Sequence, residues 1–294
     1  MLKFKNMSLL ILAVFCGLCG ITFLLQTGCS IINRSDSTLE EKAHTYHPGK
    51  FVWHELMTSD VAASKLFYGQ LFNWTFEERD QYTLIKLDNK RIGGIIQSPE
   101  NMDARWISSI SVTDVDQATD IVIANGGKSH KGPENTDDLG RAALVSDPQG
   151  AQFSLIHTKN GDTNDGPVVE GAWLWHELLT NNPKDSAVFY EALAGYSTIK
   201  ELDDYWILKT DSKWHAGIRR LLNKTLKQRW VPVIKVLNVR EISPLAKQLG
   251  GKVIIEPDNP DFVDQVALLA DTSGALFIIQ EWPETDDSKG EKKQ

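Results

Sequence analysis

The sequence predicts an α+β protein with two tandem domains, because a distinctive group of residues occurs twice along its 294 residues. Trp-His-Glu-Leu stands at residues 53–56 and again at 175–178, an offset of 122 (175 minus 53). A Phe-Tyr pair follows each copy at the same distance, at residues 67–68 and 189–190. Repetition at a fixed offset over most of a chain indicates a duplicated domain.

The N-terminal 29 residues have the layout of a bacterial lipoprotein signal. Two lysines precede an apolar run from Met7 to Leu25, and small residues then lead to Cys29, which would carry the lipid. An uncleaved membrane anchor is the alternative, because the apolar run approaches the length of a spanning helix. Secretion without any membrane attachment is the third possibility. All three predict a body outside the cytoplasm, and the first two predict one held at the membrane of the cell envelope.

Composition and cysteine usage narrow the class of protein. Hydrophobic residues make up 41% and charged residues 24%, as in an ordinary globular body. The net charge of −8, with no dense stripe of Lys and Arg, argues against nucleic-acid binding. The only cysteines are Cys16, Cys19 and Cys29, so the body after them has no disulfide, thiolate metal site or cysteine nucleophile.

The first domain is expected at residues 50–158, after a flexible polar tether at 30–49. A helix capped by Thr58-Ser59-Asp60 runs to about residue 72 and places Ala63, Phe67 and Leu71 on one face. The strands expected around this helix lie at 51–57, from 74 onward, at 82–87 and at 91–97.

The same pattern of elements then begins again inside the first domain. Gly93-Gly94 indicates a bulge or a close backbone approach just before this second module. A strand at 106–112 leads to a helix that ends at Gly126-Gly127. Asp147-Pro148-Gln149-Gly150 is a turn signature between strands at 141–145 and 151–157. Each domain is therefore predicted to contain two βαβββ modules.

The second domain is expected at residues 172–282, after a linker at 159–171 and before a charged tail at 283–294. Trp230, Gly250-Gly251 and the 271–275 stretch correspond to elements of the first domain at an offset of 124. One departure is Pro244 inside an expected helix, which predicts a helix restart with Ser243 as N-cap and Pro244 at the first position.

These motifs together resemble the vicinal oxygen chelate superfamily, which includes glyoxalase I, extradiol dioxygenases and bleomycin-resistance proteins. They are Trp-His-Glu-Leu before a capped Phe-Tyr helix, Gly-Gly after the second helix, and Asp-Pro-x-Gly-Ala before a last strand. The resemblance covers about residues 50–158 and 172–282. It implies that each pair of modules curls into an open, cupped mixed barrel, which holds a divalent metal and a substrate with two chelating oxygens.

The metal-ligand positions implied by the resemblance do not carry good ligands in this sequence. A divalent ion prefers imidazole, carboxylate or thiolate. We therefore expect no metal in the usual place and no other cofactor, with a divalent metal on displaced ligands as the alternative. The implied positions fall on Trp53, Trp175, Ser154 and Ile278, and near Ser108 and Pro232.

Two glutamates remain as candidate catalytic groups. Strand alternation places Trp53, Glu55 and Met57 on one face, which the resemblance makes the cup, and the second domain repeats this with Glu177. A carboxylate beside a tryptophan in a cavity is suited to act as a base with a raised pKa, or to hold a cationic ligand. The alternative is a structural carboxylate bonded to backbone or arginine.

Tryptophans and two histidines complete the candidate ligand-binding set. A cup lined by indoles suits a flat or apolar ligand, whereas indoles that fill the cup leave no room for one. The histidines alternate onto the opposite face, where packing under the helix competes with a ligand or acid–base role. These residues are Trp53, Trp106, Trp175, Trp230, His54 and His176.

The sequence favours a glyoxalase-like protein of the cell envelope that binds a small apolar or aromatic molecule without the usual metal site. The first alternative is a metal-dependent lyase or dioxygenase of the glyoxalase or extradiol type with displaced ligands. The second is a non-catalytic scaffold lipoprotein, because the fold alone does not fix the function.

Overall fold

The computed structural model describes residues 44–80, 82–163, 166–202, 204–210, 213–221, 226–257 and 265–282. The signal, the lipidation at Cys29 and the charged tail at 283–294 lie outside these described residues, as does most of the tether. Within the described ranges, no helix has the length and apolar character needed to cross a bilayer.

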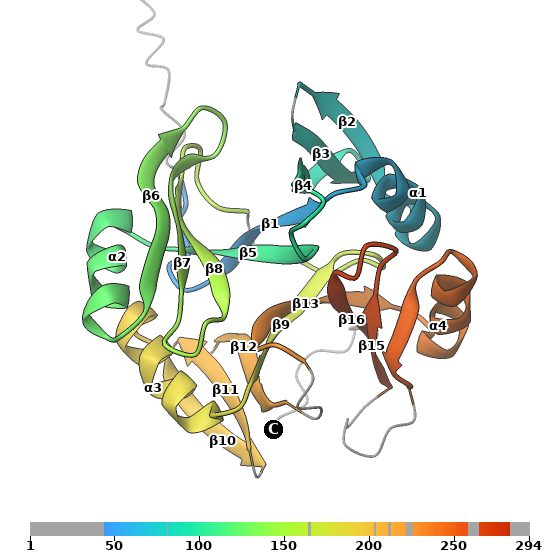
Figure 1. Cartoon of the computed structure of the whole chain (residues 1–294). Coiled ribbons are helices and arrows are strands. Elements are labelled where there is room, and N and C mark those ends of the chain that lie inside the picture. Colours follow the sequence, from blue (N-terminus) through green and yellow to red (C-terminus); the bar gives the residue numbers. More distant parts are fainter. Residues whose placement is uncertain are drawn as a thin grey trace, which may run out of the picture. The chain divides into compact units, whose positions relative to one another are not determined.

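The first half forms one mixed eight-stranded sheet with two helices (Figure 1). The strand order is β2-β3-β4-β1-β5-β8-β7-β6, with β1 and β5 antiparallel at the centre. The elements are β1 (Phe51–Thr58), α1 (Val61–Phe72), β2 (Thr75–Arg79), β3 (Tyr82–Leu87), β4 (Lys90–Gln97), β5 (Arg105–Ser111), α2 (Val115–Ala124), β6 (Lys128–Thr136), β7 (Gly140–Ser146) and β8 (Gln152–Thr158).

The second half repeats this topology in a second eight-stranded sheet, ordered β10-β11-β12-β9-β13-β16-β15-β14. The α+β fold with two tandem pairs of βαβββ modules is thereby confirmed, and both sheets are open. The elements are β9 (Trp173–Thr180), α3 (Pro183–Ala194), β10 (Ser197–Leu202), β11 (Tyr205–Thr210), β12 (Lys213–Arg220), β13 (Arg229–Val236), α4 (Val239–Gln248), β14 (Lys252–Ile255), β15 (Val266–Ala270) and β16 (Leu276–Glu281).

Local signals in the sequence account for most of these elements. The Asp60 side chain accepts from the backbone N–H of Ala63 and caps α1, as predicted. The restart predicted at Pro244 is wrong, because α4 runs through it from an Asn238 cap. A proline lacks only its own N–H, and tertiary packing of Val239, Ser243 and Ala246 holds the rest of this helix in place.

The two halves share their hydrophobic cores. One buried cluster joins α1 and its strands to β13, α4, β15 and β16 of the second half. A second joins α2, β7 and β8 to α3, β9 and β11–β13. In both of these clusters, helix-facing side chains from one half pack on those of the other, whereas a third cluster lies within the second half alone.

Two Trp–Tyr–Asp chains cross between the halves and explain the strongest repeat motifs. The indole N–H of Trp106 donates to the Tyr68 hydroxyl at 3.0 Å, and Tyr68 donates to Asp271 of the second half at 3.1 Å. Trp230 and Tyr190 make the equivalent chain to Asp147 of the first half, at 2.8 and 3.2 Å. Buried polar groups require such partners, so the Tyr of Phe-Tyr and the Asp of the turn join the halves.

Candidate functional site

The helix-free face of each sheet is called its cup here. In the first cup, β1 contributes Trp53, Glu55 and Met57, and register pairs Glu55 with Ile107 of β5. The pairing continues from Ser109 of β5 to Ser154 of β8. Paired residues in neighbouring strands point to the same face, so these side chains lie side by side.

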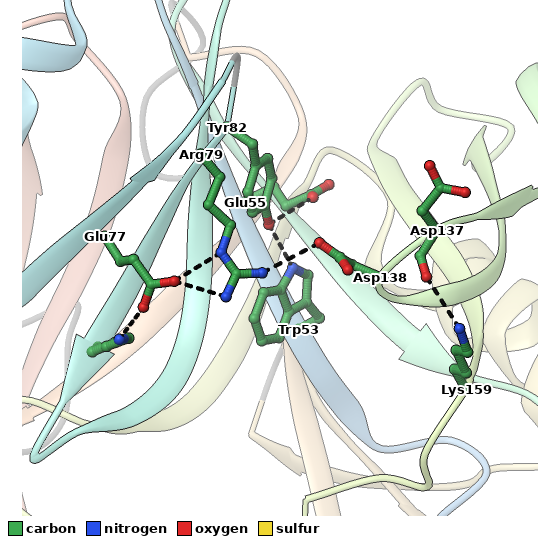
Figure 2. A network of polar contacts seen from close by, with 9 residues as sticks. Trp53, Glu55, Glu77, Arg79, Tyr82, Asp137, Asp138 and Lys159 are labelled. Carbon is green, nitrogen blue, oxygen red and sulfur yellow. Dashed lines mark hydrogen bonds and ion pairs between the residues drawn. The ribbon is translucent and has the colours of Figure 1, made fainter.

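Glu55 belongs to a small hydrogen-bonded group in the first cup, in which the Tyr82 hydroxyl links it to Trp53 (Figure 2). The Tyr82 hydroxyl of β3 donates to Glu55 Oε1 at 3.1 Å, and the Trp53 indole donates to that hydroxyl at 3.1 Å. Gly94 makes room for the tyrosine, because a Cβ there would lie 2.0 Å from the hydroxyl oxygen. The glycine pair therefore marks close approaches, as the sequence indicated: a Cβ at Gly93 would lie 2.5 Å from the backbone oxygen of His54, and one at Gly94 would meet the Tyr82 side chain.

Burial raises the pKa of Glu55 above its ordinary range, and the hydrogen bonds from Tyr82 and Trp53 and the charge of Lys131 only partly offset this. No arginine or lysine forms an ion pair with Glu55 among the described residues. Glu55 thus combines a raised pKa with a carboxylate that is only half-buried, which suits a proton acceptor or an acceptor of ligand hydroxyl groups.

An ion pair joins opposite edges of the first sheet beside this group. Arg79 on the edge strand β2 contacts Asp138 of the β6–β7 turn at 3.4 Å, and it also binds Glu77 (Figure 2). Asp138 contributes to raising the pKa of Tyr82, so the bridge lies close to the Glu55 group. Since β2 and β6 are the two ends of an eight-stranded sheet, this contact shows how far the first sheet curls.

The second cup holds the equivalent glutamate in a different electrostatic environment. The Tyr205 hydroxyl and the Trp175 indole donate to Glu177 Oε1 at 2.9 and 3.1 Å. Arg219 of β12 lies 3.7 Å from the other oxygen and over the Tyr205 ring at 4.5 Å. Burial raises the pKa of Glu177 and the Arg219 charge lowers it. Only 5% of Glu177 is exposed, so it is a buried carboxylate with a cationic partner.

Aliphatic side chains fill the second cup. A buried cluster on this face includes Val231, Val233, Leu268, Leu276 and Ile278. The first cup has Ile107, Ser109, Leu144, Gln152 and Ser154 at the equivalent positions, at an offset of 124. Ser154 and Gln152 are half-buried, whereas Ile278 is 1% exposed. Polar and partly accessible side chains are therefore found in the first cup.

Trp53 and Trp175 lie on the cup faces as predicted, but Trp106 and Trp230 do not. The latter two pair with Leu56 and Leu178 and lie in the helix-side cores, where they bind Tyr68 and Tyr190. The prediction that these two tryptophans line the cups was wrong. Side chains alternate between the faces of a strand, and Ile107 and Val231, one residue later in each strand, are the ones that face the cups.

His54 and His176 lie on the opposite face from the glutamates, where the halves meet. The rings stack with centroids 4.9 Å apart, and His176 Nε2 lies 3.3 Å from His54 Nδ1. Burial lowers the pKa of His54 to about 3, and burial with the charge of His54 lowers that of His176 further. They are packed neutral histidines with no position in either cup.

The positions that hold metal in the resembling family do not fit a metal here. In the first cup they carry Trp53 and Ser154, and the β5 position facing the cup is Ser109, because Ser108 turns to His54. In the second they carry Trp175 and Ile278. No group of three His, Cys, Asp or Glu side chains able to hold a metal occurs in the described part of the chain. The indole, hydroxyl and aliphatic side chains at these positions suit neither Mn, Fe nor Zn.

Comparison with known proteins agrees with this topology. Residues 50–155 match the family model of the glyoxalase/bleomycin resistance protein/dioxygenase superfamily. The match covers nearly all of the first half of the described body. The second half has the same strand order, so the protein consists of two domains with the glyoxalase-superfamily fold.

Three similar proteins span most of the chain. "Putative glyoxylase CFP32" of Mycobacterium tuberculosis is 28% identical over 252 residues, covering 81% of this chain and 97% of that protein. "Anthracycline biosynthesis protein DauV" of Streptomyces sp. (strain C5) is 29% identical over 264 residues, covering 80% and 94%. The Mn(II)-bound glyoxalase from Novosphingobium aromaticivorans superposes with a TM-score of 0.58 at 16% identity, covering 84% and 86%, which shows the fold alone.

Sequence reasoning missed Tyr82, Tyr205 and Arg219. A signal for the tyrosines was present, because Tyr82–Gly94 and Tyr205–Gly217 share a spacing of 12 residues (94 minus 82) in equivalent strands. Arg219 has no such signal, since Ile96 takes its place in the first half. Only the fold shows that it reaches Glu177.

Proposed function

We propose that the protein binds a small, flat organic molecule carrying hydroxyl groups in its first cup, without a resident metal. The observation that carries this is Glu55, a carboxylate with a raised pKa and no cationic partner among the described residues, beside accessible polar positions. A ligand hydroxyl would donate to Glu55, and Trp53 and Tyr82 would supply ring surfaces. The anthracycline name of one relative supports an aromatic ligand.

Catalysis is the second candidate function, and the raised pKa of Glu55 favours it. In the free carboxylate form, Glu55 would accept a proton from a ligand hydroxyl or from carbon beside a carbonyl, as a glyoxalase-like lyase requires. Tyr82 would hold the carboxylate in place through its hydrogen bond to Oε1. The binding role and the catalytic role share the same cup and the same first test.

The N-terminal sequence supports a location at the cell envelope. The run from Met7 to Leu25 followed by Cys29 would tether the body to the membrane through a lipid or an uncleaved helix. Metabolic labelling with a palmitate analogue tests this, since Cys29→Ser would remove the label from a lipoprotein. A label that persists in this variant contradicts lipidation at Cys29.

The ligand proposal is tested with 1,2-dihydroxyanthraquinone, a flat diol, and with anthraquinone, which lacks the hydroxyls. Binding is followed by tryptophan fluorescence on the full chain in mild detergent, with metal content measured by elemental analysis. We expect quenching by the diol only, and an affinity at least about tenfold weaker in Glu55→Gln, because a charge-assisted hydrogen bond contributes ~1.5–3 kcal/mol.

The matched control is Glu78→Gln on β2, an exposed glutamate that pairs with Lys65 and should leave binding unchanged. Equal quenching by both quinones, or an unchanged affinity in Glu55→Gln, contradicts the proposal. Stoichiometric bound metal would contradict the metal-free part of it.

A further inference from the structure

A cavity of about 280 Å³ lies where the starts of β5 and β13 meet. Its walls come from both halves of the chain, including Trp106 with Trp230 and Arg105 with Arg229. Each pair is related by the offset of 124 residues (229 minus 105). The cavity is thus built from equivalent positions of the duplicated domains, and its walls include Ile107, the register partner of Glu55.

The repeat places like charges opposite each other in this cavity. Arg105 pairs in register with Met57, and Arg229 pairs with Leu179 at the equivalent position. Both arginines line the cavity, and burial lowers the pKa of Arg229, while the Asp103 charge partly opposes this and the Arg105 charge adds to it. Bringing two cations together in this way destabilises the empty cavity.

A second pair of equivalent positions shows the opposite arrangement. Asp103 and Lys227, also 124 residues apart (227 minus 103), carry opposite charges and form an ion pair at the rim. Their charges cancel each other. The two arginines therefore leave the cavity with a net charge of about +2, within a chain whose formal net charge is −8.

The arginines lack carboxylate partners. Among the described residues, Arg105 donates to the backbone carbonyl of Asp103 at 3.1 Å, and Arg229 donates to that of Lys227 at 3.2 Å. Within the described ranges neither arginine forms an ion pair with a carboxylate, although the Asp103 charge acts on both, and the buried Nε of Arg105 has no hydrogen-bond partner. A buried guanidinium donor without a partner costs free energy, and an anion in the cavity would satisfy it.

From this juxtaposition we infer that the cavity between the two halves binds a small oxyanion, a phosphate or a carboxylate group, between Arg105 and Arg229. Guanidinium groups bind such oxygens through paired N–H donors, and two of them facing each other match a doubly charged anion. The amide side chains of Gln152 and Gln228 add neutral hydrogen-bonding groups to the walls. Because the anion would contact both halves, its binding would also strengthen their association.

The test is calorimetric titration of the full chain in mild detergent with inorganic phosphate, glycerol 3-phosphate and succinate, in chloride buffer. We expect one anion per chain, and the preferred probe distinguishes a free phosphate, a phosphate ester and a dicarboxylate. Arg105→Gln and Arg229→Gln should each weaken binding at least tenfold and by similar factors, because the two positions are equivalent. Arg220→Gln, whose partner Asp204 is outside the cavity, is the matched control.

Thermal unfolding supplies a second readout that does not depend on affinity. The preferred anion should raise the Tm of the wild type, whereas Arg229→Gln should unfold at a higher Tm than the wild type in chloride and show no rise with the anion. Arg229→Lys, which keeps the charge, should keep part of the rise. No heat and no Tm shift with any of the three anions overturns the inference, as does unchanged affinity in both glutamine variants.

Discussion

The first cup has Ser109 and Ser154 where the second has Val233 and Ile278, although the two sheets have the same strand order and the same strand pairing. In the second cup, aliphatic chains form a third hydrophobic core. In the first, Gln152 and Ser154 are half-buried, whereas Ile107 and Ser109 are buried. Duplication thus produced one cup filled by aliphatic side chains and one that carries polar side chains.

The two glutamates show the same division at single-residue level. Each accepts a hydrogen bond from a tyrosine of the third strand in its sheet, Tyr82 or Tyr205. Only Glu177 has Arg219 beside it, while Glu55 has Ile96 at that position. A buried carboxylate with a cationic partner is a structural element, whereas an unpaired one under partial exposure can respond to a ligand.

Removal of the cation in the second cup should give the largest effect. Arg219→Met leaves Glu177 buried without its partner, and we expect a loss of roughly 3–5 kcal/mol in unfolding free energy near pH 8. Loss of Arg219 raises the pKa of Glu177 further, since its charge now lowers that pKa. The destabilisation is therefore complete above the folded-state pKa and fades as pH falls toward the ordinary value of 4.5.

Urea unfolding at pH 5 and pH 8 measures this difference, with Ile96→Met at the equivalent site of the first cup as the control. The control should change stability by less than about 1.5 kcal/mol, because it conserves volume. The same loss for Arg219→Met at both pH values would show that packing, and not the charge, holds this site.

Exchange of the last-strand residues should give the next largest effect. Ile278→Ser creates a cavity and a buried hydroxyl in the second cup, and should cost roughly 2–5 kcal/mol. Ser154→Ile in the first cup should change stability by less than about 1 kcal/mol but abolish binding of the flat diol, because it fills the space beside Glu55. Thermal melts and fluorescence titrations report the two effects, and equal destabilisation by both would refute the comparison.

The repeat in the sequence was enough to predict the fold, because Trp-His-Glu-Leu and its companions make contacts that both halves require. Tyr68 donates a hydrogen bond to Asp271, and the repeat of both motifs gives the equivalent hydrogen bond from Tyr190 to Asp147. The site was harder to predict, since Trp106 was assigned to the cup from its place at a strand start, and alternation puts it on the other face.

The difference between the cups was also hidden in the sequence. Ser154 against Ile278 reads as an ordinary substitution until register places each beside β5 or β13. Arg219 lies 42 residues (219 minus 177) after the glutamate that it neutralises. Such pairings come from long-range strand contacts, which local patterns do not encode.

Neutralisation of the first-cup glutamate should give a smaller effect of opposite sign. Glu55 has a raised folded-state pKa, so its ionised form opposes folding above that pKa, and the penalty vanishes below about 4.5. Glu55→Gln should therefore raise the unfolding free energy near pH 8 and change it by almost nothing near pH 4.

The measurement is the difference in urea midpoint between this variant and the wild type across pH. This difference cancels the contribution of His54 and His176, whose lowered pKa values make the folded state less stable as pH falls below 6.5. A variant less stable than the wild type at pH 8 would mean that the hydrogen bond from Tyr82 outweighs the desolvation of Glu55.

Loss of the edge-to-edge ion pair should have the smallest effect on stability. Arg79 and Asp138 are accessible to solvent, and such pairs contribute little to stability, and less at high salt. Arg79→Gln should nevertheless speed hydrogen exchange in β2 and the β6–β7 turn, because this contact joins the two free edges of the first sheet. Arg91→Gln, an exposed arginine on β4, is the control. If exchange at both edges stays unchanged while diol binding weakens, Arg79 contacts the ligand directly, and the curl of the first cup is held by its sheet alone.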